Sequence, residues 1–332
     1  MHKGIFRVDD GGEFRQAGAN DLIRLLPAPN STALFIPKWL LEVLVFAIVH
    51  HHFIHLSGPT GTAKSSLVAA LDREPENFRA VCSNLGLACR PIKLFAIEMV
   101  IFESPGELIV RRALGPNGTF DEKSILVQSI EEAAQVRDEC YPLIHLREIG
   151  RVHSPAVQGG LLDLITPSDI DLPDQSRVET KGICFLADSN YQAEQDSRHT
   201  LVTLDDALAR RFSVNLTLPY LNLEQEREVV RELSQGQVTE QQLQIVKLGQ
   251  AIRNERIQGH LQSVAPPTIS GYLSFVDMAQ SLPGLTLKQV ARCTLLGNAG
   301  NDDQKHVETL LNSVFGLAAD ERDDSEIGEN LI

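Results

Sequence analysis

The stretch FIHLSGPTGTAKSS, residues 53–66, has the features of a phosphate-binding loop between a strand and a helix. An apolar, β-prone run leads into a glycine-containing turn, and the helix-forming segment 66–71 follows. This order gathers free backbone N–H groups and the positive end of a helix dipole around one point, where a nucleotide phosphate can bind. The residues expected to contact the nucleotide are Gly58, Pro59, Thr60, Gly61, Thr62, Ala63, Lys64, Ser65 and Ser66.

Two side chains of this loop have predicted roles. Lys64 is expected to reach the β- and γ-phosphates of ATP, and the Ser65 hydroxyl is expected to coordinate Mg²⁺. Ala63 stands where the pattern GxxxxGK(S/T) has its last glycine. An alanine at the first helical position adds only a methyl group and favours the helix, so we expect the loop to form. The alternative is a glycine-rich turn that binds no ligand.

Length and composition are those of a globular protein with room for two domains, or for one α/β domain with an appendage. The chain has 332 residues, of which 43% are hydrophobic. The apolar run 39–49 contains Glu42 and is too short to cross a bilayer, and no secretory signal precedes it. Five cysteines without a CxxC pair indicate reduced thiols, and hence a cytoplasmic protein. A net charge of −14 disfavours nucleic acid and favours a protein partner.

The order of segments predicts an α/β fold. Apolar runs at 91–97, 141–146 and 182–187 are expected to join residues 53–58 in a mostly parallel sheet, with helices at 124–136 and 155–165 between them. Strands that alternate with helices predict a three-layer αβα domain. Amphipathic helices follow at 224–233, 240–256, 270–281, 287–296 and 303–315. We therefore predict an N-terminal segment 1–35, an αβα nucleotide-binding domain 36–219, a helical lid domain 220–317 and an acidic flexible tail 318–332.

The strand end LIHLREI, residues 143–149, is the candidate for the acids of a nucleotide hydrolase. Glu148 occupies the position of a carboxylate that polarises water, and Arg147 stands where a metal-ordering aspartate is expected. A guanidinium about 6 Å from a divalent cation is repelled by roughly 5 kcal/mol at an effective dielectric constant near 20. Either the Arg147 side chain points away, or the site binds nucleotide without Mg²⁺-dependent turnover of normal speed.

Two further residues fit a phosphoryl-transfer site. Asn190 ends the strand FLADSN and could orient the attacking water, although asparagine also caps turns and helices. Arg211 precedes Phe212 and the last strand, 213–218, where it could act as an arginine finger on a neighbouring subunit. The alternative for Arg211 is a surface ion pair with Asp205 or Asp206.

The loop GPTGTAKS, the LREI strand end, Asn190 and the box LDDALARRF occur in the order and spacing of AAA+ ATPases. More narrowly, the chain resembles the MoxR-like group, with CbbQ, GvpN and the dynein-related modules nearby. Supporting features are the lead-in FIPK at 35–38, the segment 103–112, and a hairpin expected at 171–178. The segment PPTISGY, residues 266–272, departs from the family because it lacks the arginine that members often carry as a second sensor.

The resemblance implies a P-loop NTPase of the AAA+ type that forms a ring, commonly a hexamer, with Arg211 of one subunit at the site of the next. It also implies ATP and Mg²⁺ as cofactors, and remodelling of a protein client, often with a von Willebrand factor A domain adaptor. Because Arg147 makes the Walker B motif degenerate, a subunit that binds nucleotide structurally and hydrolyses it weakly is the first alternative. A nucleic-acid motor or loader of the same fold is the second.

Overall fold

The computed structural model describes residues 5–7, 21–27, 32–115, 118–165, 169–172, 176–190 and 204–316, with backbone alone at 5–7. The chain divides into two compact units. The first comprises Met1–Pro59 and Ala63–Pro219, and the second comprises Thr60–Thr62 and Tyr220–Ile332. The predicted acidic tail 318–332 lies outside the described residues.

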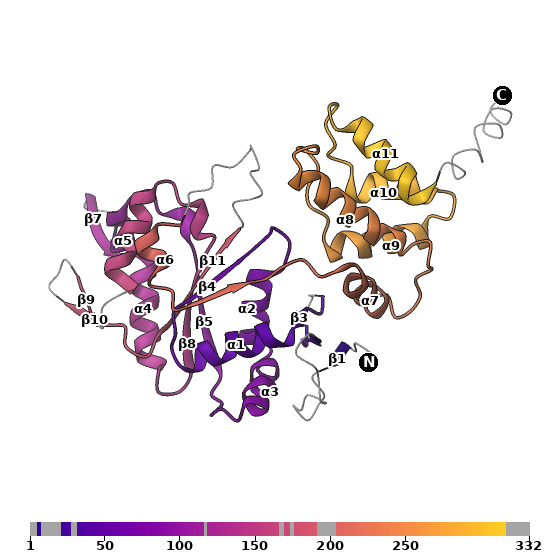
Figure 1. Ribbon diagram of the computed structural model, residues 1–332. Helices are drawn as coiled ribbons and strands as arrows, with labels where there is room; N and C mark the ends of the chain where they lie inside the picture. Colours follow the sequence, from indigo (N-terminus) through magenta and orange to yellow (C-terminus); the bar gives the residue numbers. More distant parts are fainter. Residues whose placement is uncertain are drawn as a thin grey trace. The chain divides into compact units, whose positions relative to one another are not determined.

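The first unit is built on a five-stranded parallel sheet in the order β12-β4-β11-β8-β5, which confirms the predicted α/β class (Figure 1). Its strands are β4 (Ile54–Gly58), β5 (Ile92–Glu98), β8 (Tyr141–Arg147), β11 (Cys184–Asn190) and β12 (Val214–Thr217). The strand β4 that leads into the phosphate loop lies between β11 and β12. Because all strands are parallel, their carboxyl ends share one edge, where the loop also lies.

Helices cover both faces of this sheet, as the predicted three-layer arrangement requires. One face packs against α1 (Lys38–Val49), α2 (Lys64–Arg73) and α3 (Pro75–Leu85). The other packs against α4 (Ile125–Val136), α5 (Pro155–Ile165) and the short α6 (Asp206–Ala209). On β11 the side chains alternate between the two cores: Cys184 and Leu186 lie in the first, Phe185 and Ala187 in the second. This alternation places Asp188 on the face that α2 covers.

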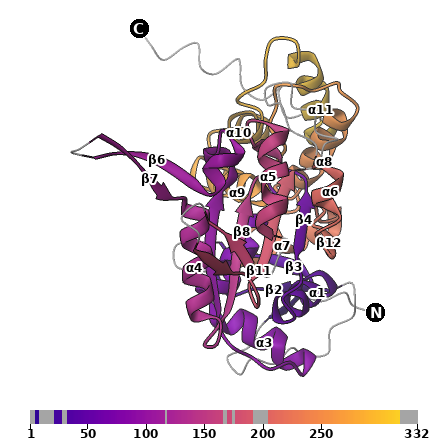
Figure 2. The same cartoon turned by 90° about the vertical axis from the view of Figure 1, so that its left-hand side faces the viewer.

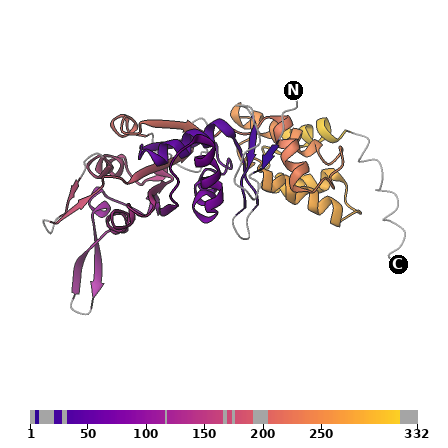
Figure 3. The ribbon, with the colours of Figure 1, turned by 90° about the horizontal axis from the view of Figure 1, so that it is seen from below.

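Two hairpins and three short 3₁₀ turns also belong to the first unit among the residues that the structure describes. Strands β9 (Asp169–Asp171) and β10 (Arg177–Glu179) pair antiparallel and confirm the expected hairpin. A second hairpin, β6 (Val110–Gly115) with β7 (Gly118–Lys123), was not predicted. It extends away from the rest of the α/β unit in Figures 2 and 3, so its strands lack the apolar alternation that a buried face imposes. Between β5 and this hairpin lie two short 3₁₀ turns, Met99–Ile101 and Pro105–Leu108, and a third, Ile149–Arg151, follows β8.

A small sheet precedes the first helix. Strand β1 (Ile5–Arg7) pairs parallel with β2 (Leu22–Arg24), and β2 pairs antiparallel with β3 (Phe35–Pro37). The buried Ile23 and Leu25 belong to the same core as α1. Part of the predicted N-terminal segment 1–35 is thus packed into the α/β unit.

The second unit is helical. Its helices are α7 (Leu223–Leu233), α8 (Gln244–Ile257), α9 (Ile269–Ser281), α10 (Leu287–Leu295) and α11 (Gln304–Phe315). They surround their own core, with Tyr272 and Phe275 fully buried in it. The five predicted helices are confirmed, but α8 begins at Gln244 rather than at 240, because turns occupy 240–243. Within the described residues, no helix combines the length and apolar character needed to cross a membrane.

Candidate nucleotide-binding site

The phosphate loop connects β4 to α2 with a left-handed residue at the helix start. Ala63 is the N-cap of α2, with φ 65° and ψ 28°, and Lys64 is the first helical residue. The expectation that Ala63 would be helical is therefore wrong. A residue with a Cβ atom in this conformation costs about 1–2 kcal/mol relative to a right-handed one, which glycine avoids. The loop forms nevertheless, with Ser65 half-buried and Ser66 exposed in the first turn of α2.

Lys64 is buried inside the loop that it is expected to serve, with 7% of the residue exposed. Its Nζ atom donates hydrogen bonds to the carbonyl oxygens of Gly58 and Pro59, each at 2.9 Å. It donates a third to Oδ1 of Asn190, also at 2.9 Å. Three oxygen atoms thus hold the ammonium group within the loop, and a phosphate bound there could replace them as its partners.

Asn190 reaches Lys64 because β11 pairs directly with β4, where Asn190 is in register with Gly58. The structure therefore brings Asn190 to Lys64, although 126 positions separate the two residues in the chain. An amide at this point can hydrogen bond either to Lys64 or to a water beside a bound phosphate.

The acid nearest to Ser65 is Asp188, on β11. The Ser65 hydroxyl donates to Oδ2 of Asp188 at 2.8 Å. The same oxygen is 2.8 Å from Nε2 of His145, and Oδ1 accepts the backbone N–H of Glu148 at 2.7 Å. Asp188 and His145 are almost completely buried, with 2% and 1% exposed. Burial alone would raise the pKa of Asp188, but the hydrogen bonds and the charge of His145 outweigh it and hold this pKa below its ordinary value.

Arg147 is turned away from this carboxylate. It ends β8 in register with Glu98 of β5, and its guanidinium forms an ion pair with the Glu98 carboxylate. The two side chains are 37% and 44% exposed, so this is a pair at the edge of the sheet. Of the two possibilities raised by the sequence, the structure shows the one in which the guanidinium points away.

Glu148 lies in the left-handed region, with φ 55°. A glutamate rarely adopts this conformation, and such strain is found mainly at functional sites. Its N–H is fixed by Asp188, and its carboxylate forms an ion pair with Arg151 at 3.1 Å. The carboxylate expected to polarise water is thus at the carboxyl end of β8, with a cation beside it.

Arg211 is exposed just before the buried Phe212. The Asp205 carboxylate caps α6, accepting from the N–H groups of Ala207 and Leu208 at 2.9 and 3.1 Å. Asp205 therefore acts as the N-cap of α6.

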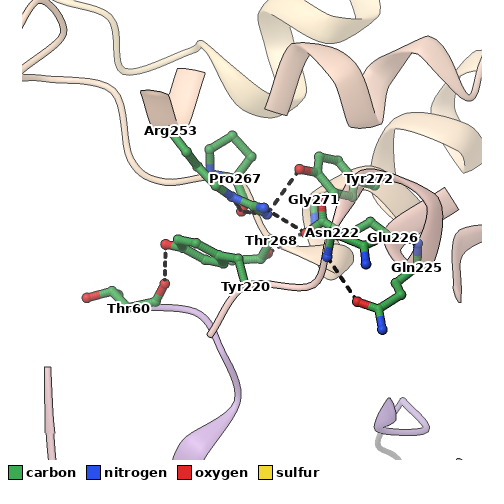
Figure 4. A network of polar contacts seen from close by, with 10 residues as sticks. All are labelled: Thr60, Tyr220, Asn222, Gln225, Glu226, Arg253, Pro267, Thr268, Gly271 and Tyr272. Carbon is green, nitrogen blue, oxygen red and sulfur yellow. Dashed lines mark hydrogen bonds and ion pairs between the residues drawn. The ribbon is translucent and has the colours of Figure 1, made fainter. Parts of the chain in front are cut away.

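The tip of the loop, Thr60–Thr62, groups with the helical unit. The Tyr220 hydroxyl donates to the carbonyl oxygen of Thr60 at 2.8 Å (Figure 4). Gly61 has φ 83°, and a Cβ atom built on it would lie 2.5 Å from Cγ2 of Thr268. Thr268 caps α9 through the N–H of Gly271 at 3.3 Å. The loop tip therefore needs glycine both for its conformation and for its close approach to the start of α9.

Arg253 organises the surroundings of this contact. Its guanidinium lies 3.9 Å from the centre of the Tyr220 ring and donates to Oε1 of Glu226 at 2.7 Å (Figure 4). It also donates to the carbonyl oxygen of Pro267, at 3.1 and 2.6 Å, and to the Tyr272 hydroxyl at 3.1 Å. The Arg253 and Glu226 side chains are 6% and 2% exposed. A buried cation thus joins α7, α8 and the segment before α9.

The sequence reasoning missed Asp188 and His145. The strand FLADSN carried a usable signal, because Asp188 lies two positions before Asn190 and a strand repeats its faces every two residues. His145 lies two positions before Arg147 in the same way. The sequence pattern predicts an acid at the end of β8, whereas the acid that contacts Ser65 lies on the neighbouring strand β11.

No family model matches this chain, and no curated protein matches it. Among solved structures, it is similar to a candidate ATPase from Cytophaga hutchinsonii, with 16% identity, a TM-score of 0.40, and coverage of 83% of this chain and 89% of that one. It is also similar to the RuvB Holliday junction branch migration motor of Thermotoga maritima, with 14% identity, a TM-score of 0.43, and coverage of 83% and 75%. Both likenesses are remote, so the geometry of this chain itself must support a function.

Proposed function

We propose that the chain is an ATPase of the AAA+ type that binds ATP at Gly58–Ser66. The observation that carries this proposal is the convergence of Lys64, Ser65 and Asn190 at the start of α2. The backbone N–H groups of the loop and the amino end of α2 favour a phosphate there. Lys64 can exchange its carbonyl partners for the β- and γ-phosphates, and this exchange supplies the charge that the phosphates need.

The donor atoms at this point also fit Mg²⁺, which prefers oxygen ligands and usually binds through one or two protein groups together with phosphates. Ser65 offers a hydroxyl oxygen, and Asp188 offers a buried carboxylate 2.8 Å from it. When bound, the ion would neutralise the charge of the phosphates. Within the described residues, no group of three or more His, Cys, Asp or Glu side chains could hold a metal, so we expect Mg²⁺ to bind only with the nucleotide.

For hydrolysis we propose three residues. Glu148 would accept a hydrogen bond from the attacking water, Asn190 would orient that water, and Arg211 would act on the nucleotide of a neighbouring copy. The strained backbone of Glu148 and the exposure of Arg211 support these roles. A ring of copies, hexameric by resemblance, is the assembly that would place Arg211 at the next site.

The resemblance to the MoxR-like group is the basis for proposing what the ATPase cycle drives. The chain would remodel or activate a protein client, with a von Willebrand factor A domain protein as a possible adaptor. The net charge of −14 supports a protein rather than a nucleic-acid partner.

Equilibrium binding of a fluorescent ATP analogue, followed by steady-state phosphate release, tests the proposal. We expect Lys64→Ala to weaken ATP binding by more than about 100-fold, because two or three charge-assisted hydrogen bonds at about 1.5–3 kcal/mol each are lost. Lys93→Ala, at an exposed lysine of β5, is the matched control and should leave binding unchanged. Equal binding by wild type and Lys64→Ala would overturn the proposal.

A subunit that binds ATP structurally and hydrolyses it weakly is the second candidate. The ion pair of Glu148 with Arg151 favours it, since a carboxylate held by a guanidinium is a weaker acceptor for the attacking water. If this candidate is right, wild type binds ATP without measurable turnover, and Arg151→Ala raises turnover by freeing Glu148. Turnover in wild type that Glu148→Gln abolishes would favour the first candidate.

A further inference from the structure

Asp188, the acid that contacts Ser65 of the phosphate loop, lies on β11 and not on β8, where the family motif has its aspartate. In P-loop NTPases the metal is held by the loop Ser or Thr and by an aspartate of the Walker B strand. Here the corresponding position at the end of β8 is Arg147, whose side chain pairs with Glu98. The Ser65 hydroxyl instead donates to Asp188 on β11. We propose that Asp188 is the metal-ordering carboxylate of this chain, transferred from β8 to the neighbouring strand.

The sheet topology makes this transfer possible. Strand β11 lies between β4 and β8, so a carboxylate on β11 is one strand closer to the loop than one on β8. Leu146 of β8 is in register with Ala187 of β11, and Arg147 and Asp188 follow as the next residues of the two strands. A carboxylate therefore exists at the level of the sheet where the motif requires one, displaced sideways by one strand.

The hydrogen bond fixes the orientation of the Ser65 hydroxyl. A serine hydroxyl has one proton and two lone pairs, and its proton is directed to Oδ2 of Asp188. The lone pairs are then left for a cation on the other side of the oxygen. This arrangement suits Mg²⁺ delivered with the nucleotide, since the carboxylate can keep its hydrogen bond to Ser65 while the cation binds.

Buried hydrogen bonds fix the orientation of the Asp188 carboxylate. His145 and the Glu148 N–H contact both carboxylate oxygens, at 2.8 and 2.7 Å. Partners of this kind orient metal-binding groups, and their loss typically reduces metal affinity by about 10- to 100-fold. Because the Glu148 N–H is one of them, the same carboxylate also fixes the turn that carries the proposed water-polarising residue.

The inference rests on the proposed ATP binding, and one set of titrations separates the two. ATP affinity is measured with Mg²⁺ and with EDTA for wild type, Asp188→Asn, Arg147→Gln and Lys64→Ala, and Mn²⁺ bound with ATP is followed by electron paramagnetic resonance. We expect the divalent cation to strengthen ATP binding in wild type and Arg147→Gln. In Asp188→Asn this strengthening and the Mn²⁺ affinity should fall by about 10- to 100-fold, while binding in EDTA is retained.

The outcomes are distinct. Loss of binding in Lys64→Ala alone, with an unchanged cation effect in folded Asp188→Asn, would overturn the inference and leave the proposed function intact. If wild type binds ATP equally well with Mg²⁺ and with EDTA, the inference about Asp188 is also overturned, whereas ATP binding itself stands. A wild type that binds no ATP would overturn the proposed function itself. If Asp188→Asn does not fold, Asp188→Ser, which leaves room for a water, replaces it with the same expected result.

Discussion

The hydroxyl of Ser65 donates a hydrogen bond to Asp188 at 2.8 Å, although 123 positions separate the two residues in the chain. The contact joins the first turn of α2 to the strand beside the phosphate loop. It also explains why Arg147 can occupy the end of β8, because the buried carboxylate that the loop needs is supplied from β11. Substitution of Asp188 should therefore cost much more stability than substitution of Arg147.

The first prediction concerns these two residues. Arg147→Gln should change the free energy of unfolding by less than about 1 kcal/mol, because its ion pair with Glu98 is partly exposed and screened by water. Asp188→Ala should cost at least about 2 kcal/mol, because Ser65, His145 and the Glu148 N–H lose a buried acceptor. Urea unfolding followed by circular dichroism measures both. A larger loss for Arg147→Gln than for Asp188→Ala would contradict the assignment.

The second prediction concerns the left-handed residue of the loop. Ala63→Gly should raise the free energy of unfolding by up to about 1 kcal/mol. Glycine removes a conformational cost of about 1–2 kcal/mol, and the greater freedom of the unfolded chain offsets about 0.4–1 kcal/mol of that gain. Ala69→Gly, inside α2, is the control and should lower stability by about 1 kcal/mol. Thermal unfolding in which both variants lose stability would show that Ala63 is not strained.

The third prediction separates conformation from packing at the loop tip. Gly61→Ala should destabilise the protein and weaken ATP binding, because it meets both a positive φ and the Thr268 methyl group. Gly86→Ala is a matched control, since Gly86 also has positive φ, of 65°, but nothing lies within 4 Å of its Cβ position. The control should cost about 1–2 kcal/mol and leave ATP binding unchanged. If both variants lose the same stability and bind ATP alike, the contact of Gly61 with Thr268 is not made in solution.

The fourth prediction concerns the buried ion pair of the helical unit. Arg253→Met should lower the free energy of unfolding by about 3–5 kcal/mol, because the Glu226 charge remains buried without its cation. Adding Glu226→Gln should restore part of this loss. Arg231→Gln, which breaks a pair with the exposed Glu240 side chain, should cost far less than Arg253→Met, because water screens this pair. Equal losses for Arg253→Met and Arg231→Gln in urea unfolding would refute the structural role of Arg253.

The fifth prediction concerns the cysteines. Cys89 and Cys293 are exposed, whereas Cys82, Cys140 and Cys184 are buried and none of the five forms a disulfide. Burial, with a contribution from Cys89, raises the pKa of Cys82 to about 12, and burial also raises the pKa of Cys140 and of Cys184. Since the thiolate is the reactive form, iodoacetamide at pH 8 should label Cys89 and Cys293 in the folded protein and the other three only in urea. Mass spectrometry of the digested protein identifies the labelled cysteines. Rapid labelling of Cys184 without urea would contradict its burial in the core.

Local patterns sufficed to predict much of the architecture. The apolar runs at 91–97, 141–146 and 182–187 became β5, β8 and β11, because strands of a parallel sheet are buried on both faces and need continuous apolar residues. The helices of the second unit followed from their amphipathic periodicity. The exposed hairpin β6–β7 escaped prediction because its cross-strand hydrogen bonds impose no apolar pattern.

The sequence by itself determined the phosphate loop with Lys64 and Ser65, because these residues stand at short, fixed spacing, and the αβα class, because strands and helices alternate along the chain. Only the tertiary structure decided which acid serves Ser65, where Arg147 points, and that Arg253 is buried against Tyr220. These contacts depend on the order of strands in the sheet and on the packing of helices. Neither is encoded in any single stretch of sequence, since the interacting residues meet only when the core has formed.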